Sequence, residues 1–211
     1  MKLETAPYLV QRDEWPATGR HILAQHDAET VVVYQAYAPA IGRFAAKHGR
    51  FGGEFSYDRM SWVKPNFLWM MYRSDWGRSE NQTVVLAVRL RRTFFDALLA
   101  AAVPSSFRGS GYADEKSWQA AVAASDVRLQ WDPDHRPTGQ PCERRALQLG
   151  LRRATLAAYG TKETLEILDI SSFVAEQRDN VKDGASRLML PRERVYLPAD
   201  PVVAERLGLG S

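Results

Sequence analysis

The stretch FSYDRMSWVKPNFLWMMYR, residues 55–73, combines two of the six tryptophans with three methionines and three cations. Pro65 divides it into two parts with different periodicity. The residues before Pro65 alternate as in a strand, and those after it place apolar side chains at helical spacing. The stretch therefore predicts a strand over 55–63 followed by a helix over 66–73, with the rest of the chain as the scaffold that positions them.

Alternation along the predicted strand would place Tyr57, Arg59 and Ser61 on one face, with Lys64 just beyond it. A cationic and aromatic surface of this kind suits a ligand that has a planar ring and phosphates. A structural interpretation competes with this one. Trp62, Trp69, Tyr72 and the methionines would then be plain core, and Arg59 would form a buried ion pair with Asp58, Glu54 or Asp132.

Strands and helices are interspersed along the remaining chain without a regular βαβ rhythm. No glycine-rich phosphate loop or dinucleotide-binding fingerprint is present. The sequence thus predicts an α+β fold, with a mixed, mostly antiparallel sheet and helices packed around it. We expect strands over 29–37, 82–89, 127–131, 144–151, 164–170 and 194–197. We expect helices over 18–25, 39–47, 91–102, 114–124, 152–159 and 171–177, an irregular segment over 1–16 and a turn-rich loop over 132–139.

Length and composition are those of an ordinary globular protein of 211 residues, with 45% hydrophobic and 25% charged residues. They predict a single domain over 1–211, with a core over about 19–181, an irregular N-terminal segment and a C-terminal tail. No apolar run approaches the roughly 20 residues of a membrane helix, and no signal peptide is visible. We expect a cytoplasmic protein without a membrane partner. The net charge of +3 and the excess of arginine over lysine permit an anionic ligand without requiring one.

The familiar catalytic templates are missing. Cys142 is the single cysteine and the four histidines are scattered, so no metal site is expected. Neither a GxSxG nor an HExxH motif occurs. What remains is a set of polar and aromatic side chains at predicted strand ends. The candidate ligand-binding residues are Tyr34, Tyr37, Tyr57, Arg59, Lys64, Trp131, Asp132, His135 and Arg144, accompanied by Gln35 and Gln148.

Four motifs together resemble a bacterial and fungal family known as domain of unknown function 4291. They read YQAYxPxIxxFA, FSxxRMSWxKPxFLWMMYRS, QWDPxH and RxLQLGLR in this sequence. The resemblance spans residues 19–181. It implies the extent of the domain but no settled activity.

The strand VVVYQAY, followed directly by a helix, is also similar to the first motif of ADP-ribosyltransferase-type domains. Those domains are compact, split, mixed sheets that bind NAD. The resemblance implies NAD as cofactor and makes Gln35, Ser61 and Gln148 the catalytic candidates. Gln35 stands where His or Arg is usual, and Gln148 stands in the third motif in place of the Glu associated with transfer to protein arginine. Arg59 or Lys64 would pair with the pyrophosphate, and Gln148 would hold a ribose hydroxyl.

Three hypotheses for function follow. The first is an NAD- or nucleotide-using enzyme of the ADP-ribosyltransferase or NAD glycohydrolase kind, acting on a small nucleotide-like ligand. The second is a nucleic-acid (RNA or DNA) binding or processing module, and the third is a non-catalytic ligand or protein interaction domain. The sequence does not predict the oligomeric state. The most informative observation is whether segments 34–37, 59–64, 131–135 and 144–148 converge on one cleft. The first hypothesis needs Gln35 and Gln148 to reach the same place.

Overall fold

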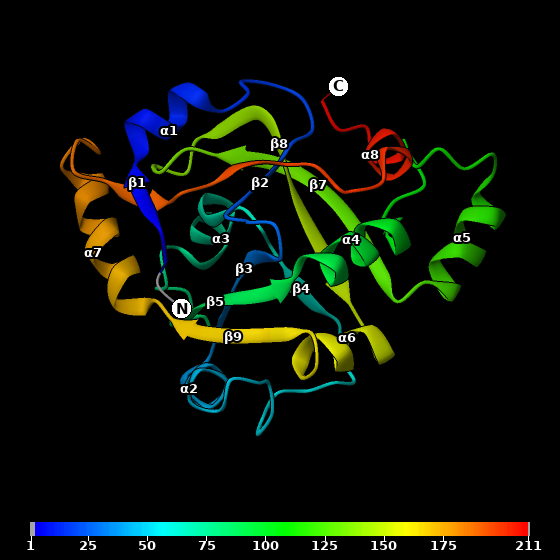
Figure 1. The fold of residues 1–211 in the computed structure, drawn as a ribbon, viewed down its shortest axis with the longest axis horizontal. Coiled ribbons are helices and arrows are strands. Elements are labelled where there is room, and N and C mark those ends of the chain that lie inside the picture. Colours follow the sequence, from blue (N-terminus) through cyan, green and yellow to red (C-terminus); the bar gives the residue numbers. More distant parts are fainter. Residues whose placement is uncertain (1–2, 211) are drawn as a thin grey trace.

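The computed structural model describes residues 3–210, in which eight helices surround mostly antiparallel sheets (Figure 1). This confirms the predicted α+β class. One main sheet has the strand order β3–β5–β9, and the other has the order β4–β8–β7–β6 with a parallel β6–β7 pair. The first contains β3 (Thr30–Tyr37), β5 (Val84–Arg91) and β9 (Thr164–Asp169). The second contains β4 (Ser61–Val63), β8 (Pro141–Leu151), β7 (Val127–His135) and β6 (Val103–Pro104).

The two main sheets meet where the backbones of Tyr34 and Lys64 form an isolated antiparallel bridge. The amide of Tyr34 donates to the carbonyl of Lys64 at 2.7 Å, and the amide of Lys64 donates back at 3.3 Å. Lys64 directly follows β4, so the bridge joins the end of that strand to β3. The stretch predicted to organise the fold thus lies at the seam between the sheets.

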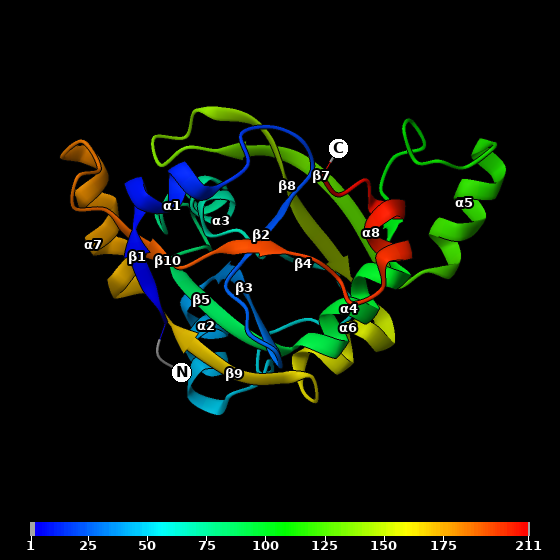
Figure 2. The ribbon, with the colours of Figure 1, turned by 45° about the horizontal axis from the view of Figure 1, so that its top comes forward.

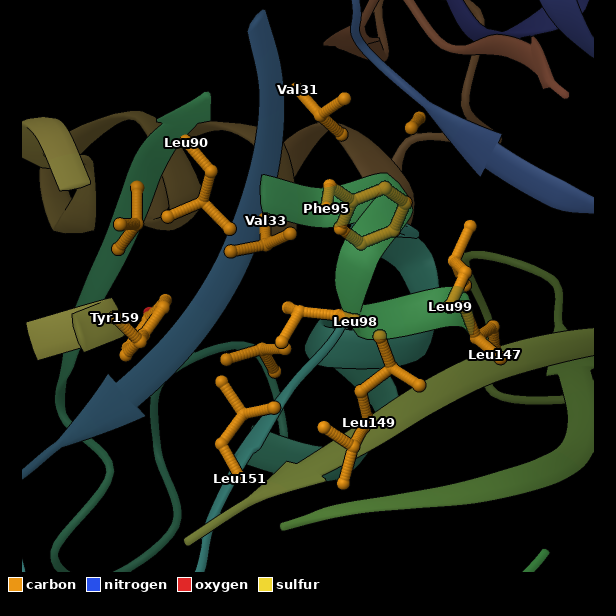
Figure 3. Packing of buried hydrophobic residues seen from close by; sticks show 14 of the residues in the cluster. Val31, Val33, Leu90, Phe95, Leu98, Leu99, Leu147, Leu149, Leu151 and Tyr159 are labelled. Atoms are coloured by element: carbon orange, nitrogen blue, oxygen red, sulfur yellow. The ribbon is translucent and has the colours of Figure 1, made fainter. Parts of the chain in front are cut away.

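Helix α4 (Arg92–Ala101) fills the space between the two sheets (Figure 3). Its Phe95, Leu98 and Leu99 are buried in the same cluster as aliphatic side chains from both sheets. These partners include Val31, Val33 and Leu90 on one side and Leu147, Leu149 and Leu151 on the other. Burying each such side chain stabilises the fold by about 1.5–3 kcal/mol. This core fixes the edges of the two sheets relative to each other.

A second apolar cluster covers the opposite face of β3 and β5. It involves α3 (Phe67–Ser74) and α7 (Ser171–Lys182), and α1 (Tyr8–Glu14) lies on the same side of the molecule (Figure 2). The side chain of Asn66 accepts a hydrogen bond from the amide of Trp69 at 2.7 Å and so caps α3. The predicted helix over 66–73 is confirmed. The remaining helices are α2 (Pro39–His48), α5 (Glu115–Ala124), α6 (Arg153–Gly160) and α8 (Pro201–Leu207).

Two predictions near the N-terminus are wrong. The helix expected over 18–25 is replaced by β2 (Ile22–Ala24), which pairs with β11 (Arg194–Tyr196). The irregular segment expected over 1–16 contains β1 (Thr5–Pro7), which pairs with β10 (Met189–Pro191), and then α1. Both strands obtain their partners from the far end of the chain. Such pairing depends on tertiary context that local periodicity does not report.

Two strand lengths also differ from expectation. The strand predicted over 55–63 is reduced to Ser61–Val63, because Phe55 and Tyr57 pack into an aromatic cluster with Phe51 and take no part in a ladder. Conversely, β7 continues to His135 through the predicted loop, with a register shift after Pro133. A proline is tolerated at such an irregularity because it has no amide hydrogen to donate. Among residues 3–210, no helix has the length and apolar character needed to cross a bilayer.

Candidate functional site

A cleft of about 550 Å³ lies at the seam between the two sheets. Its walls come from the end of β3, from β4 and the turn before it, and from α3 and the β7–β8 pair. The lining residues are Gln35, Ala36, Tyr37, Arg59, Met60, Ser61, Trp62, Lys64, Met70, Arg73, Gln82, Gln130 and Gln148. Most of the predicted site residues of β3 and β4 thus meet Gln148 of β8 in one place.

Gln35 is the centre of a hydrogen-bonded network on one wall. Its amide nitrogen donates to Ser61 Oγ at 2.9 Å and to the Trp62 carbonyl at 3.0 Å. Its amide oxygen accepts from the Tyr159 hydroxyl at 2.5 Å, and the Tyr37 hydroxyl lies 2.7 Å from Ser61 Oγ. Both amide hydrogens of Gln35 are used, and the residue is 2% exposed. Gln35 therefore positions Ser61 at the cleft and has no free donor for a ligand.

The floor of the cleft is the polar face of the β4–β8–β7 sheet. Trp62 lies opposite Gly150 and Gln130 lies opposite Gln148 in the strand register. A Cβ atom at position 150 would come within 2.6 Å of the Met60 sulfur and 3.1 Å of the Trp62 ring. A glycine at this position is what allows these two side chains to lie against the sheet.

Asp132 lies on the same floor and is held by two glutamines. Gln148 Nε2 donates to one carboxylate oxygen at 2.7 Å, and Gln130 Nε2 donates to the other at 2.9 Å. The two glutamine side chains fix the carboxylate while leaving their own amide oxygens without a hydrogen bond among residues 3–210. Asp132 does not itself line the cleft, but it contacts two residues that do, and its negative charge acts on Lys64.

Lys64 is buried at the seam, with 4% of its surface exposed. Its ammonium group makes no hydrogen bond or ion pair with any residue in the described range 3–210. Burial and, to a smaller extent, the positive charge of Arg73 lower the pKa of Lys64 to about 8, and the charge of Asp132 opposes them. Arg59 and Arg73 are exposed at the cleft and likewise form no ion pair with a described carboxylate. The cleft therefore presents three cations that form no ion pair among residues 3–210.

Two predicted site residues lie elsewhere, near the tip of the β7–β8 hairpin. Arg144 pairs with buried Asp134, with Nη2 2.5 Å and Nε 2.8 Å from the same carboxylate oxygen, and its guanidinium lies over the Trp15 ring. His135 stacks on Tyr72, with 3.5 Å between ring centroids, and burial lowers its pKa. Both side chains serve internal packing and do not line the cleft.

Tyr34, Tyr57 and Trp131 also point away from the cleft. Tyr34 is fully buried edge-on against Phe67, and its hydroxyl lacks a hydrogen-bond partner among the described residues. The Tyr57 hydroxyl donates to the Phe51 carbonyl at 3.0 Å. Trp131 packs against the main core, with the Arg20 guanidinium 5.9 Å from its ring. The buried ion pair considered for Arg59 does not form either, because that side chain is exposed.

Sequence reasoning missed several residues that line the cleft. Period-two alternation along Val127–Asp132 places Gln130 beside Asp132, and helical spacing places Met70 beside Arg73. Trp62, considered as core, lines the cleft. Trp69 and the two methionines after it are buried as the core interpretation predicted. Gln82 precedes β5 and carries no pattern that could have identified it.

The chemistry of the cleft suits an anionic organic ligand. Across residues 3–210, no three His, Cys, Asp or Glu side chains are grouped to hold a metal ion. The donors that face the cleft are guanidinium, ammonium and hydroxyl groups, which bind phosphate and sugar oxygens.

No curated protein matches this sequence. A family model described as Domain of unknown function (DUF4291) matches residues 21–196, a range that contains both main sheets and every residue lining the cleft. This match confirms the resemblance carried by the RMSWVKP and QLGLR motifs. The chain belongs to the DUF4291 family.

Proposed function

We propose that the cleft binds a nucleotide-like ligand, with NAD as the candidate cofactor, and that the protein is an ADP-ribosyltransferase-like or NAD glycohydrolase-like enzyme. The observation that carries this proposal is the presence around one cleft of three cations, Arg59, Lys64 and Arg73, that form no ion pair with any described residue. The volume of the cleft falls within the range of about 300–1,000 Å³ typical of small-molecule sites.

The arginines supply the phosphate contacts in this proposal. Arg59 and Arg73 are exposed, and a guanidinium can bind two phosphate oxygens at once. Trp62, beside Met60 and Met70, offers a flat apolar wall for a planar base or nicotinamide ring. The ligand would then extend from the arginines towards the floor formed by the β4–β8–β7 sheet.

The floor supplies the groups for cleavage of the bond between ribose and nicotinamide. When this bond breaks, nicotinamide leaves with the bonding electrons and positive charge develops on the ribose carbon. The carboxylate of Asp132, fixed by Gln148 and Gln130, would stabilise that charge. The free amide oxygen of Gln148 and the hydroxyl of Ser61 would accept hydrogen bonds from ribose hydroxyls. Water or an acceptor group then forms the new bond to the ribose carbon and releases its proton to solvent.

Calorimetric titration with NAD, ADP-ribose and AMP, combined with an assay for nicotinamide release, tests the proposal. We expect all three to bind the wild-type protein. We expect Asp132→Asn to retain NAD binding while lowering nicotinamide release by on the order of a hundredfold, because it removes a preorganised charge. Asp75→Asn, at an exposed position outside the cleft, is the matched control and should behave as wild type.

Failure of NAD, nucleotides and their fragments to bind at millimolar concentration would refute the proposal. Single-stranded RNA and DNA belong in the same titration at two salt concentrations. Salt-dependent binding of strands without affinity for mononucleotides would favour the nucleic-acid hypothesis. Changes confined to stability across the cleft variants would favour a non-catalytic interaction domain.

A further inference from the structure

We infer that Lys64 is a reactive amine whose side-chain nitrogen forms a covalent imine with the aldehyde of a ring-opened ribose phosphate, such as that of ADP-ribose. This inference rests on the proposed function, because it assigns the sugar of the same ligand to the floor of the same cleft. It adds a covalent role that nucleotide binding alone does not require.

The surroundings of Lys64 differ from those of the other buried cations. Arg144 pairs with Asp134, and Arg128 donates to the carbonyl of Ser125 at 3.1 Å. Lys64 is buried to a similar degree, yet its ammonium group has no partner within the described chain. An unpaired buried charge costs several kcal/mol, so a side chain of this kind lowers the stability of the folded state. It lines the cleft, where a ligand can reach it.

The backbone holds Lys64 in place at the seam. Both of its backbone polar groups are bonded to Tyr34, and Pro65 follows directly. The exposed arginines lie on the turn before β4 and on α3. This division suits phosphates that meet the arginines and a sugar that reaches the amine. An amine that served only as a phosphate counter-ion would gain nothing from burial, since burial disfavours its charge.

The protonation state of Lys64 favours the same role. Only the neutral amine attacks a carbonyl carbon. With a pKa of about 8, roughly one Lys64 side chain in ten is neutral at neutral pH. The ordinary lysine pKa of 10.5 gives a neutral fraction on the order of a hundredfold smaller. Lys64 should therefore react with aldehydes much faster than an exposed lysine does.

The step balances without an oxidant or a metal. The nitrogen of Lys64 attacks the C1 aldehyde, a carbon–nitrogen bond forms, and the carbonyl oxygen leaves as water with the two amine hydrogens. In this proposal Asp132, whose charge acts on Lys64, accepts a proton from the nitrogen and returns it to the departing oxygen. The product is a C=N bond that hydrolysis reverses and hydride reduction makes permanent.

The test is reductive trapping. The intact protein is incubated with ADP-ribose and sodium cyanoborohydride, which delivers hydride to the C=N bond, and modified peptides are identified by mass spectrometry. We expect the adduct at Lys64 to exceed that at Lys162, whose side chain is 82% exposed, by about tenfold or more. AMP, which occupies the cleft but has no free aldehyde, should suppress the Lys64 adduct. Equal modification of Lys64 and Lys162 would overturn the inference, and so would a lack of suppression at AMP concentrations that saturate the protein in the binding titration.

Further experiments distinguish failure of this inference from failure of the proposed function. Lys64→Arg and Lys64→Met should lose the adduct while still unfolding cooperatively. If NAD and AMP bind wild type but no Lys64 adduct forms, the inference fails and the proposed function stands. If ribose 5-phosphate modifies Lys64 but no nucleotide binds, the proposed function fails and the reactive amine stands.

Discussion

Two clusters beside the β7–β8 pair each contain a basic side chain and an aspartate. The two residues form an ion pair in one cluster and not in the other. At the tip of the hairpin, Arg144 contacts the buried carboxylate of Asp134 at 2.5 Å. On the sheet floor, Asp132 is held by two glutamine amides, and Lys64 remains without a partner among residues 3–210. A buried charge paired within the protein is part of the scaffold. A buried charge that faces a cleft unpaired is available to a ligand.

The tip of the hairpin therefore behaves as an anchor. Arg144 also donates to the carbonyl of Pro16, which ties the hairpin to the segment after α1. His135 lies in a stack with Tyr72 and Trp69. The side chains of this cluster contact other residues of the same chain, which suits a structural role. The two clusters thus make distinct predictions for mutation.

The largest effect is expected at the anchor. Arg144→Met leaves the carboxylate of Asp134, 1% exposed, without its cation. Breaking a buried ion pair in this way costs about 3–5 kcal/mol of unfolding free energy. Urea unfolding near neutral pH measures the loss, and adding Asp134→Asn to the same variant should recover part of it. Arg145→Met, at the exposed neighbouring position, is the control and should stay within about 0.5 kcal/mol of wild type. Equal losses of unfolding free energy in Arg144→Met and Arg145→Met would contradict a structural role for the Arg144–Asp134 pair.

At the cleft, removing the basic side chain is expected to raise the free energy of unfolding. The folded-state pKa of Lys64 is about 8, below the value of 10.5 expected when the side chain is solvated. Below pH 8 the lysine is charged in both states, and the folded state bears the full cost of burying the charge, about 3 kcal/mol. This cost disappears as the pH rises from 8 to 10.5. Lys64→Met should therefore be more stable than wild type at neutral pH and lose that advantage at high pH.

Urea unfolding of Lys64→Met across this pH range measures the effect. Lys162→Met serves as control because its side chain is exposed, and it should show little change at any pH. A destabilised Lys64→Met at neutral pH would place Lys64 with Arg144 among the scaffold residues. A gain in stability would show that Lys64 lowers the unfolding free energy of the wild-type protein, as expected of a residue kept for function.

The same distinction explains how far the sequence could predict the site. Periodicity identified β3, β5 and α3, and the strand register then brought Gln35, Ser61, Lys64 and Gln148 together. The sequence could not show that Arg144 and His135 find partners at the hairpin tip. Those partners are Asp134 from the facing strand and Tyr72 from α3. Whether a polar residue is paired depends on tertiary contacts, which single-sequence patterns do not contain.

The fold shows the same limit at its edges. Helices and strands with strong local periodicity were predicted within a few residues, as for β3 and α2. The strands β2 and β1 were not, because their hydrogen bonds come from β11 and β10 at the other end of the chain. Pairs so distant in sequence leave no local signal.

Gln35 combines features of both clusters, because it lines the cleft yet its side chain is hydrogen-bonded within the protein, as the side chain of Arg144 is. Gln35→Met would leave the buried Tyr159 hydroxyl without its acceptor and would remove the amide that donates to Ser61 Oγ. We expect a loss of about 2 kcal/mol in unfolding free energy, measured by urea denaturation. Gln82→Met, which also lines the cleft but removes no hydrogen bond between described residues, should cost little. Loss of NAD turnover in Gln35→Met without loss of stability would instead support the catalytic role suggested by the ADP-ribosyltransferase resemblance.

Replacing Arg73 tests whether the unpaired cations of the cleft bind a ligand. The smallest change in unfolding free energy is expected here. Arg73→Met removes an exposed guanidinium that makes no ion pair with described residues, so stability should change by less than about 0.5 kcal/mol. Binding of AMP or NAD should weaken by about tenfold, as expected for loss of one charge-assisted contact to a phosphate. Arg78→Met is the matched control, because Arg78 is also exposed but pairs with Asp75 outside the cleft. Added salt should weaken the wild-type complex more than the Arg73→Met complex, since the variant has one charge fewer to screen. Equal affinities for wild type, Arg73→Met and Arg78→Met would mean that the cations of the cleft do not meet the phosphates.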